Sequence, residues 1–245
     1  MLSYNSNTPI IGVTRSGLQD IWNAFMLVGA HYSANDIPLC PTTAHSLPTK
    51  LVSYDDAKMI HRKELRKGNL DYHAEGFVHF YIDDQKFDGK QSSIWLYPEK
   101  AVEILRHFDG IIAPDFSTYA DFPEPLKRWN FFRMNAFGYW AGILGIPVIS
   151  NLRWGTEETW SYCFDANPKH SMLAIGTVGS GIRMLKNRRL FDEGLQKAVE
   201  ILRPHTIIVY GSAKYPVFED LRNRGILIVS FPSKTEEAYA GRSKP

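Results

Sequence analysis

The chain has 245 residues, 44% of them apolar and 13% aromatic, which favours one large folded domain and excludes a disordered chain. Its formal net charge of +2 is too small to indicate nucleic-acid or membrane binding from overall charge alone. The two cysteines, Cys40 and Cys163, lack metal-binding spacing, which is typical of free thiols. Because no segment is patterned as a signal peptide or membrane span, we expect a soluble, cytoplasmic protein without a membrane partner.

Residues 1–50 are predicted to form an irregular extension that packs on the main domain. Ser16 and Gln19 have capping-box spacing at the start of a helix. The apolar residues of this helix share one face: Leu18, Ile21, Trp22, Phe25 and Met26. Three prolines between residues 38 and 48 then exclude a long regular element.

The main domain is predicted to span residues 51–233, and residues 234–245 to form a loose polar tail. A helix is expected after Ser53, which is a suitable cap. Six short runs rich in Val, Ile, Phe and Tyr are predicted strands: 76–84, 109–117, 146–154, 171–179, 206–212 and 225–232. Between them lie predicted helices: 97–108, 123–145, 188–204 and 214–225.

This alternation predicts an α/β domain with a largely parallel sheet and flanking helices. The sheet could be open and doubly wound, or barrel-like if residues 8–13 and another early segment also form strands. The sequence does not separate these two architectures.

Polar side chains gather where the predicted strands end, which is where ligands bind in parallel α/β sheets. Asp83 and Asp84 end one strand and Asp115 ends the next, so the three carboxylates are candidate catalytic groups. Asp84 and Asp115 are also candidate ligands for Mg²⁺, the one cofactor that the pattern suggests. Alternatively, these residues only cap helices and anchor turns. Further candidate ligand-binding residues end the other strands: Asn151, Arg153, Trp154, Thr177, Tyr210 and Ser212.

Arg133 falls on the apolar stripe of the helix predicted at 123–145, where an exposed charge is not expected. A buried guanidinium needs a partner, because unpaired burial of a charge is very costly. Three explanations stay open: pairing with a strand-end aspartate, binding of substrate, or extension of the side chain to the helix edge. We count Arg133 among the candidate catalytic residues.

Residues 176–189 combine glycines with cations, a composition that suits a phosphate group. The glycines are Gly176, Gly179 and Gly181, with Ser180 between them, and Arg183 is the first of four cations. The pattern is neither a P-loop nor a dinucleotide-binding fingerprint. We expect the next helix to begin near Arg189, which would separate the glycines from the helix N-terminus. A flexible surface loop is the alternative.

Several segments resemble an uncharacterised bacterial and phage family, the domain of unknown function DUF4417. The similar pieces include "LVSYDDA", "VHFYIDDQKF", "APDFSTYADF", "KRWNFFRMNAFGYWAG" and "IIVYG", within about residues 50 to 232. The resemblance implies a phage or mobile-element setting and supplies no activity. The residues it would make recurrent are Asp83, Asp84, Phe87, Asp115, Ser117, Trp129, Asn130, Arg133 and Gly138.

Two hypotheses follow. In the first, the strand ends bind a phosphorylated ligand, nucleotide or nucleic acid, with Mg²⁺-dependent phosphoester chemistry at the aspartates. In the second, the protein is a non-enzymatic accessory factor that binds DNA or a host protein, and the carboxylates and Arg133 form a structural network. The sequence does not decide between these hypotheses. It does not indicate the oligomeric state either.

Overall fold

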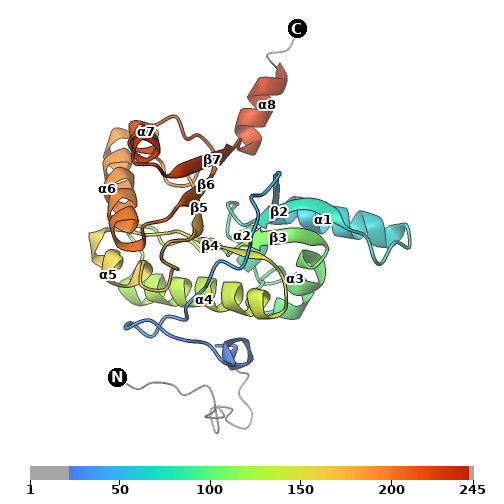
Figure 1. Cartoon of the computed structure of the whole chain (residues 1–245). Coiled ribbons are helices and arrows are strands. Elements are labelled where there is room, and N and C mark those ends of the chain that lie inside the picture. Colours follow the sequence, from blue (N-terminus) through green and yellow to red (C-terminus); the bar gives the residue numbers. More distant parts are fainter. Residues whose placement is uncertain (1–21, 243–245) are drawn as a thin grey trace.

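The computed structural model describes residues 22–242 and shows seven parallel strands in one curled sheet that resembles half a barrel (Figure 1). The strands lie side by side in the order of the chain. They are β1 (Leu51–Ser53), β2 (Ala74–His79), β3 (Phe108–Ile112), β4 (Val148–Asn151), β5 (Met172–Gly176), β6 (Thr206–Tyr210) and β7 (Leu227–Phe231).

Every strand predicted from the sequence is present, as β2 to β7, and the α/β class is confirmed. The consecutive order decides for the barrel-like architecture, because a doubly wound sheet reverses its strand order at a switch point. The sheet is not closed, since β1 and β7 do not pair with each other in the described part of the chain.

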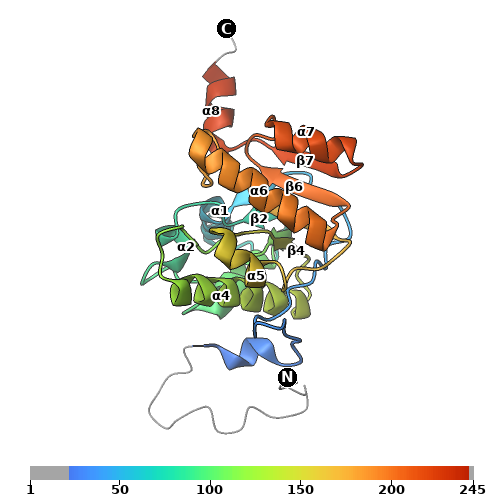
Figure 2. The same ribbon diagram turned by 90° about the vertical axis from the view of Figure 1, so that its left-hand side faces the viewer.

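Helices cover the outer face of the curled sheet (Figure 2). Eight α-helices and two short 3₁₀ helices occur in residues 22–242. They are η1 (Ala24–Leu27), α1 (Tyr54–Arg66), α2 (Gln85–Asp88), α3 (Pro98–Leu105), α4 (Glu124–Ile143), η2 (Glu157–Thr159), α5 (Trp160–Cys163), α6 (Leu185–Leu202), α7 (Pro216–Asn223) and α8 (Lys234–Arg242).

Helix boundaries follow the sequence prediction at some ends and depart from it at others. Ser53 caps α1 as expected, accepting a hydrogen bond from the backbone N–H of Asp56. Helix α6 begins at Leu185 rather than near Arg189. The segment predicted to be a loose tail contains α8, which projects from the body of the molecule (Figure 1).

The N-terminal predictions are only partly covered by the structure. The strand at 8–13 and the start of the helix at Ser16 lie outside the described residues. Within them, the predicted helix is represented by η1 alone. Helix η1 packs against α4, so the described part of the extension does contact the main domain.

Most of the core lies between the sheet and its helices. Helix α4 approaches the sheet closely at Gly138, where a Cβ atom would lie 2.5 Å from Sγ of Cys40 and 3.0 Å from Cβ of Ala113. Any larger residue there would push the helix away from β3. Cys40 and Cys163 are free and buried, and burial raises the pKa of the Cys40 thiol to about 12.

The inner face of the sheet carries an aromatic group built around His79, which is 2% exposed. Its ring centroid lies 4.1 Å from that of Tyr210 and 5.6 Å from that of Tyr81. Nδ1 of His79 accepts the backbone N–H of Tyr81, so this ring nitrogen carries no proton. The pKa of His79 is lowered from 6.5 to about 3, mainly by burial and also by Lys234, while Asp56 opposes this effect. His79 is therefore a neutral core residue.

A buried neutral histidine makes stability depend on pH in a defined direction. The unfolded chain takes up a proton near pH 6.5 and the folded chain only near pH 3, so this contribution is complete above pH 6.5 and is lost as pH falls. The free energy of unfolding should decrease by about 1.4 kcal/mol per pH unit between these values through this residue. In His79→Phe this slope should flatten in urea unfolding measured from pH 7 to pH 4. His45→Gln, at an exposed histidine, is the control, and an unchanged slope in His79→Phe would contradict the assignment.

Candidate functional site

A cavity of about 300 Å³ lies at the carboxyl ends of β3, β4 and β5. Its wall is formed by the segments that follow these strands and by the first turns of α6. The lining residues are Asp115, Thr118, Tyr119, Ala120, Leu152, Arg153, Trp154, Gly155, Ile175, Gly176, Gly179, Ser180, Gly181, Asn187, Leu190 and Phe191. We call this space the strand-end cavity.

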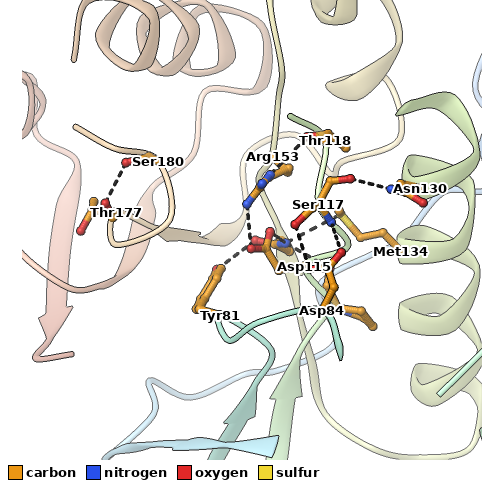
Figure 3. Close-up of polar contacts among 12 residues, drawn as sticks. Tyr81, Asp84, Asp115, Ser117, Thr118, Asn130, Met134, Arg153, Thr177 and Ser180 are labelled. Carbon is orange, nitrogen blue, oxygen red and sulfur yellow. Dashed lines mark hydrogen bonds and ion pairs between the residues drawn. The ribbon is translucent and has the colours of Figure 1, made fainter. Parts of the chain in front are cut away.

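An ion pair between Asp115 and Arg153 forms one side of the strand-end cavity (Figure 3). Nη1 of Arg153 donates to the Asp115 carboxylate at 2.8 Å, and its Nε donates to Thr118 Oγ1 at 3.2 Å. The Nη2 group of Arg153 donates to none of residues 22–242. A fixed guanidinium with an unused donor edge is therefore present in the cavity wall.

A hydrogen-bond relay holds the other oxygen of Asp115. Tyr81 donates its hydroxyl to Oδ1 of Asn151 at 2.9 Å, and Nδ2 of Asn151 donates to Oδ1 of Asp115 at 2.9 Å. Burial raises the pKa of Asp115 above its ordinary value of 3.8; Arg153 and Asn151 oppose this effect, and Asp84 adds to it. The pKa of Asp115 is thus raised by burial and lowered by specific partners, and such perturbed carboxyl groups are common at functional sites.

Gly176, Gly179 and Gly181, at the end of β5 and just after it, line the cavity, and we call this segment the glycine bend. Gly176 was predicted to contact a ligand, but its lack of a side chain has another consequence. A Cβ atom on Gly176 would lie 2.6 Å from the ring of Tyr81, so this glycine makes room for that side chain. Gly181 has a φ of +65°, which a side chain would strain. Gly179 has open space around it, and Ser180 closes the bend by donating to the carbonyl of Thr177 at 2.7 Å.

The early start of α6 brings a helix N-terminus to the cavity. Met184, at its N-cap, makes no side-chain cap hydrogen bond, and the first turn contains no acidic residue. Asn187 in that turn lines the cavity. The prediction that a basic loop separates the glycines from the helix start is wrong, because only three residues lie between Gly181 and Leu185. The partial positive charge of the helix end therefore lies near the cavity.

Of the four cations in residues 183–189, two have a hydrogen-bond or ion-pair partner and two have none among the described residues. Arg188 donates to the carbonyl of Ile182, and Arg189 pairs with Glu193 at 2.7 Å. Arg183 and Lys186 are exposed and have no hydrogen-bond or ion-pair partner among residues 22–242. These two cations are available to a ligand.

A second network lies behind the loop that carries Asp115. Ser117 donates to Asp84 through its backbone N–H at 3.1 Å and through its hydroxyl at 2.8 Å (Figure 3). Asn130 on α4 donates to the carbonyl of Ser117 and accepts from Arg133 Nη2 at 2.7 Å. Nη1 of Arg133 reaches both carboxylate oxygens of Asp88, at 3.0 and 2.8 Å.

Of the three explanations for Arg133, pairing with a carboxylate is therefore correct, but the partner is different. Asp88 is at the end of the short helix α2 and is not one of the predicted strand-end aspartates. The guanidinium also lies 4.0 Å from the centroid of the Phe116 ring. Arg133 does not line the strand-end cavity, so its predicted catalytic role has no support in this position.

The structure brings together about half of the predicted site residues. Asp115, Arg153, Trp154, Gly176, Gly179, Ser180 and Gly181 all line the strand-end cavity. The predicted residues that do not line it are Asp83, Asp84, Arg133, Asn151, Thr177, Arg183, Tyr210 and Ser212. Asp83 is exposed, Thr177 is buried against β6, and the hydroxyl of Tyr210 accepts the backbone N–H of Lys234.

Other residues of the cavity wall were not predicted. Thr118 and Tyr119 follow Ser117 directly, and a polar and aromatic pair beyond a strand end is a usable signal. Asn187 stands among the cations of the loop. Leu190 and Phe191 carry no such signal, because apolar residues of a helix normally face the core.

No group of three or more His, Cys, Asp or Glu side chains in residues 22–242 is arranged to hold a metal ion. Asp84 and Asp115 are engaged by Ser117 and by Arg153 respectively, and a Mg²⁺ site at these two residues stays a prediction. Within the same residues, no helix is both long and apolar enough to cross a membrane.

The Arg133–Asp88 pair should be essential for stability, since both side chains are largely buried. Arg133→Gln leaves the Asp88 carboxylate without its partner, and the free energy of unfolding should fall by about 3 kcal/mol. The double variant Asp88→Asn with Arg133→Gln should lose clearly less, because it buries no unpaired charge. Urea unfolding of the single and double variants measures this coupling. Arg224→Gln, in an exposed pair with Asp220 at the C-terminal end of α7, should change stability by no more than about 0.5 kcal/mol. Equal losses in single and double variants would contradict a buried ion pair.

Comparisons with known proteins agree with the resemblance seen in the sequence. The chain is 30% identical over 215 residues to "Gene 1 protein" of Mycobacterium phage D29, covering 86% of this chain and 73% of that protein. It is 29% identical over 236 residues to "Gene 1 protein" of Mycobacterium phage L5, covering 90% of this chain and 95% of that protein. No solved structure matches. Residues 29–232 match the family described as "Domain of unknown function (DUF4417)", and the chain belongs to that family.

Proposed function

We propose that the strand-end cavity binds a small phosphorylated ligand of nucleotide size. The observation that carries this proposal is the Arg153 guanidinium, which is fixed by Asp115 and Thr118 and whose Nη2 group donates to no other described residue. Phosphate oxygens fit the planar donor edge of an arginine. Because Arg153 is already oriented, a phosphate gains these hydrogen bonds without the cost of ordering the side chain.

The opposite side of the cavity supports the same kind of ligand. Gly179 and Gly181 bring the backbone close to the cavity without side chains, and α6 begins four residues after Gly181. A helix N-terminus without a side-chain cap or an acidic first turn favours an anion. An anion in the cavity would thus meet positive charge from two sides.

Apolar and aromatic side chains form the remainder of the wall and suit a base or another flat group. Trp154 is held in place by Phe191, with ring centroids 5.3 Å apart. Gly194 on α6 leaves room for the indole, since a Cβ atom there would lie 2.2 Å from its Nε1. The volume of about 300 Å³ is at the lower end of the roughly 300 to 1,000 Å³ of ligand sites, which fits a small ligand.

Phosphoester chemistry at the aspartates, which the sequence suggested, is a separate proposal that ligand binding does not require. Both oxygens of Asp115 accept hydrogen bonds, and Asp84 accepts two from Ser117. A Mg²⁺ ion at these carboxylates would have to displace Arg153 or Ser117. We therefore expect ligand binding to occur without Mg²⁺. The alternative, an accessory protein that binds DNA or a host protein, needs no ligand in the cavity.

Thermal unfolding with inorganic phosphate and nucleoside mono-, di- and triphosphates, with and without Mg²⁺, tests the proposal. A ligand at about 100 times its Kd should raise Tm by roughly 5 to 10 °C, because it stabilises only the folded chain. The double variant Asp115→Asn with Arg153→Gln removes the guanidinium without leaving an unpaired buried carboxylate. It should lose the Tm shift while remaining folded.

A second variant tests the cavity by filling it. Gly179→Phe adds a side chain where a Cβ atom meets nothing within 4 Å, so it should abolish the shift with little effect on unliganded Tm. Ser212→Phe, at a predicted residue outside the cavity, is the control and should keep the shift. The absence of a shift with every phosphate compound, or a shift that survives in both cavity variants, would refute the proposal.

A further inference from the structure

We propose that the occupant of the strand-end cavity is the terminal nucleotide of a single-stranded nucleic acid, and that Arg183 and Lys186 bind the phosphates next to it. This inference rests on the proposed function, because it places a nucleotide in the cavity. It adds a surface outside the cavity and a polymeric partner.

The two free cations are placed where a strand leaving the cavity would pass. Arg183 lies between Gly181 and Asn187 in the chain, and both of these residues line the cavity. Lys186 directly precedes Asn187 and lines a separate depression on α6 rather than the strand-end cavity itself. Both cations are exposed, and neither has a partner in residues 22–242. Arg188 and Arg189 differ in this respect, because the first donates to the carbonyl of Ile182 and the second pairs with Glu193.

Arg183 and Lys186 belong to a short basic segment. No acidic residue occurs from residue 177 to residue 191, which contains the four cations near α6. Asp192 and Glu193 follow on the same helix, and Glu193 pairs with Arg189. The net charge of the whole chain is only +2, so the basic character is local. A local basic surface at the edge of an anion-binding cavity is suited to a polyanion with regularly spaced phosphates.

The size of the cavity selects a single strand. A space of about 300 Å³ is at the lower end of the range for ligand sites, so it suits one nucleotide better than a base pair. A duplex end would therefore have to separate before its terminal nucleotide entered. Single-stranded nucleic acid meets no such cost.

The rim of the cavity offers the apolar contacts that single strands use. Tyr119 lines the cavity and is 52% exposed, and Phe122 packs edge-to-face against it at 5.2 Å between centroids. This leaves a face of the Tyr119 ring for a stacked base. Val178, Met184 and Leu185 are exposed beside the cations and add apolar surface. Cations, exposed aromatic surface and a cavity together fit a nucleic acid better than an acidic peptide, which would have no group for the cavity.

Fluorescence anisotropy with labelled oligothymidylates and oligouridylates of one to six nucleotides tests the inference on the full chain. We expect affinity to increase with length over the first few nucleotides, for DNA, RNA or both. The double variant Arg183→Gln with Lys186→Gln should weaken hexanucleotide binding on the order of tenfold at low salt and leave the mononucleotide unchanged. The slope of log K against log salt should become shallower by about 1.4, or about 0.7 for each lost phosphate contact.

A matched control is available on α1, on the opposite side of the molecule (Figure 1). Lys63 and Arg66 are exposed and form no ion pair in the described residues, so Lys63→Gln with Arg66→Gln removes the same charge. This variant should bind the hexanucleotide with an unchanged salt slope.

The outcomes separate the two proposals. Mononucleotide binding without any gain from added nucleotides would overturn this inference and leave the proposed function intact. Failure of mononucleotides and oligonucleotides alike would refute both. Equal affinity for a duplex of the same sequence, or equal losses in the α1 control variant, would also overturn the inference, since the cavity and its adjoining cations would then not be responsible.

Discussion

The loop that follows β3 is held by carboxylates from two sides, and the arrangement of the site depends on it. On one side Asp84, which precedes α2, accepts two hydrogen bonds from Ser117. On the other side the loop's own Asp115 pairs with Arg153 after β4. Charges in such positions are tolerated only with their partners in place, because an unpaired buried charge is costly. These contacts hold the loop in place, and the loop forms one wall of the strand-end cavity.

The residues that carry the family resemblance belong mainly to this support. Asp84, Ser117, Asn130 and Arg133 form the network behind the loop, and Gly138 lets α4 pack closely against the sheet. These residues fix the position of the cavity wall, but none of them lines the cavity. The glycine bend and the cations near α6 contribute the surface that a ligand would meet. Asp115, which also carries the resemblance, belongs to both groups, because it anchors the loop through Arg153 and lines the cavity.

Local patterns predicted the elements well where the elements are long or strongly apolar. Strand β1 was missed because three residues are too few to show a pattern. The start of α6 was placed too late because the cations before Arg189 are as compatible with a helix as with a loop, so the local sequence does not mark the first residue of the helix. The partner of Arg133 was missed because α2 has only four residues, and nothing local marks Asp88 as buried.

The sequence by itself determined the α/β class, the six longer strands and the need of Arg133 for a partner, since these follow from periodicity and from the cost of burying a charge. It also placed Asp115, Arg153 and the glycine bend at strand ends, which lie on one edge of a parallel sheet. Only the tertiary structure decided that the strands curl in consecutive order and that Arg133 pairs with Asp88. It alone showed that Gly176 accommodates Tyr81. These outcomes depend on contacts between residues far apart in the chain, and no local pattern encodes which distant residue fills a given space.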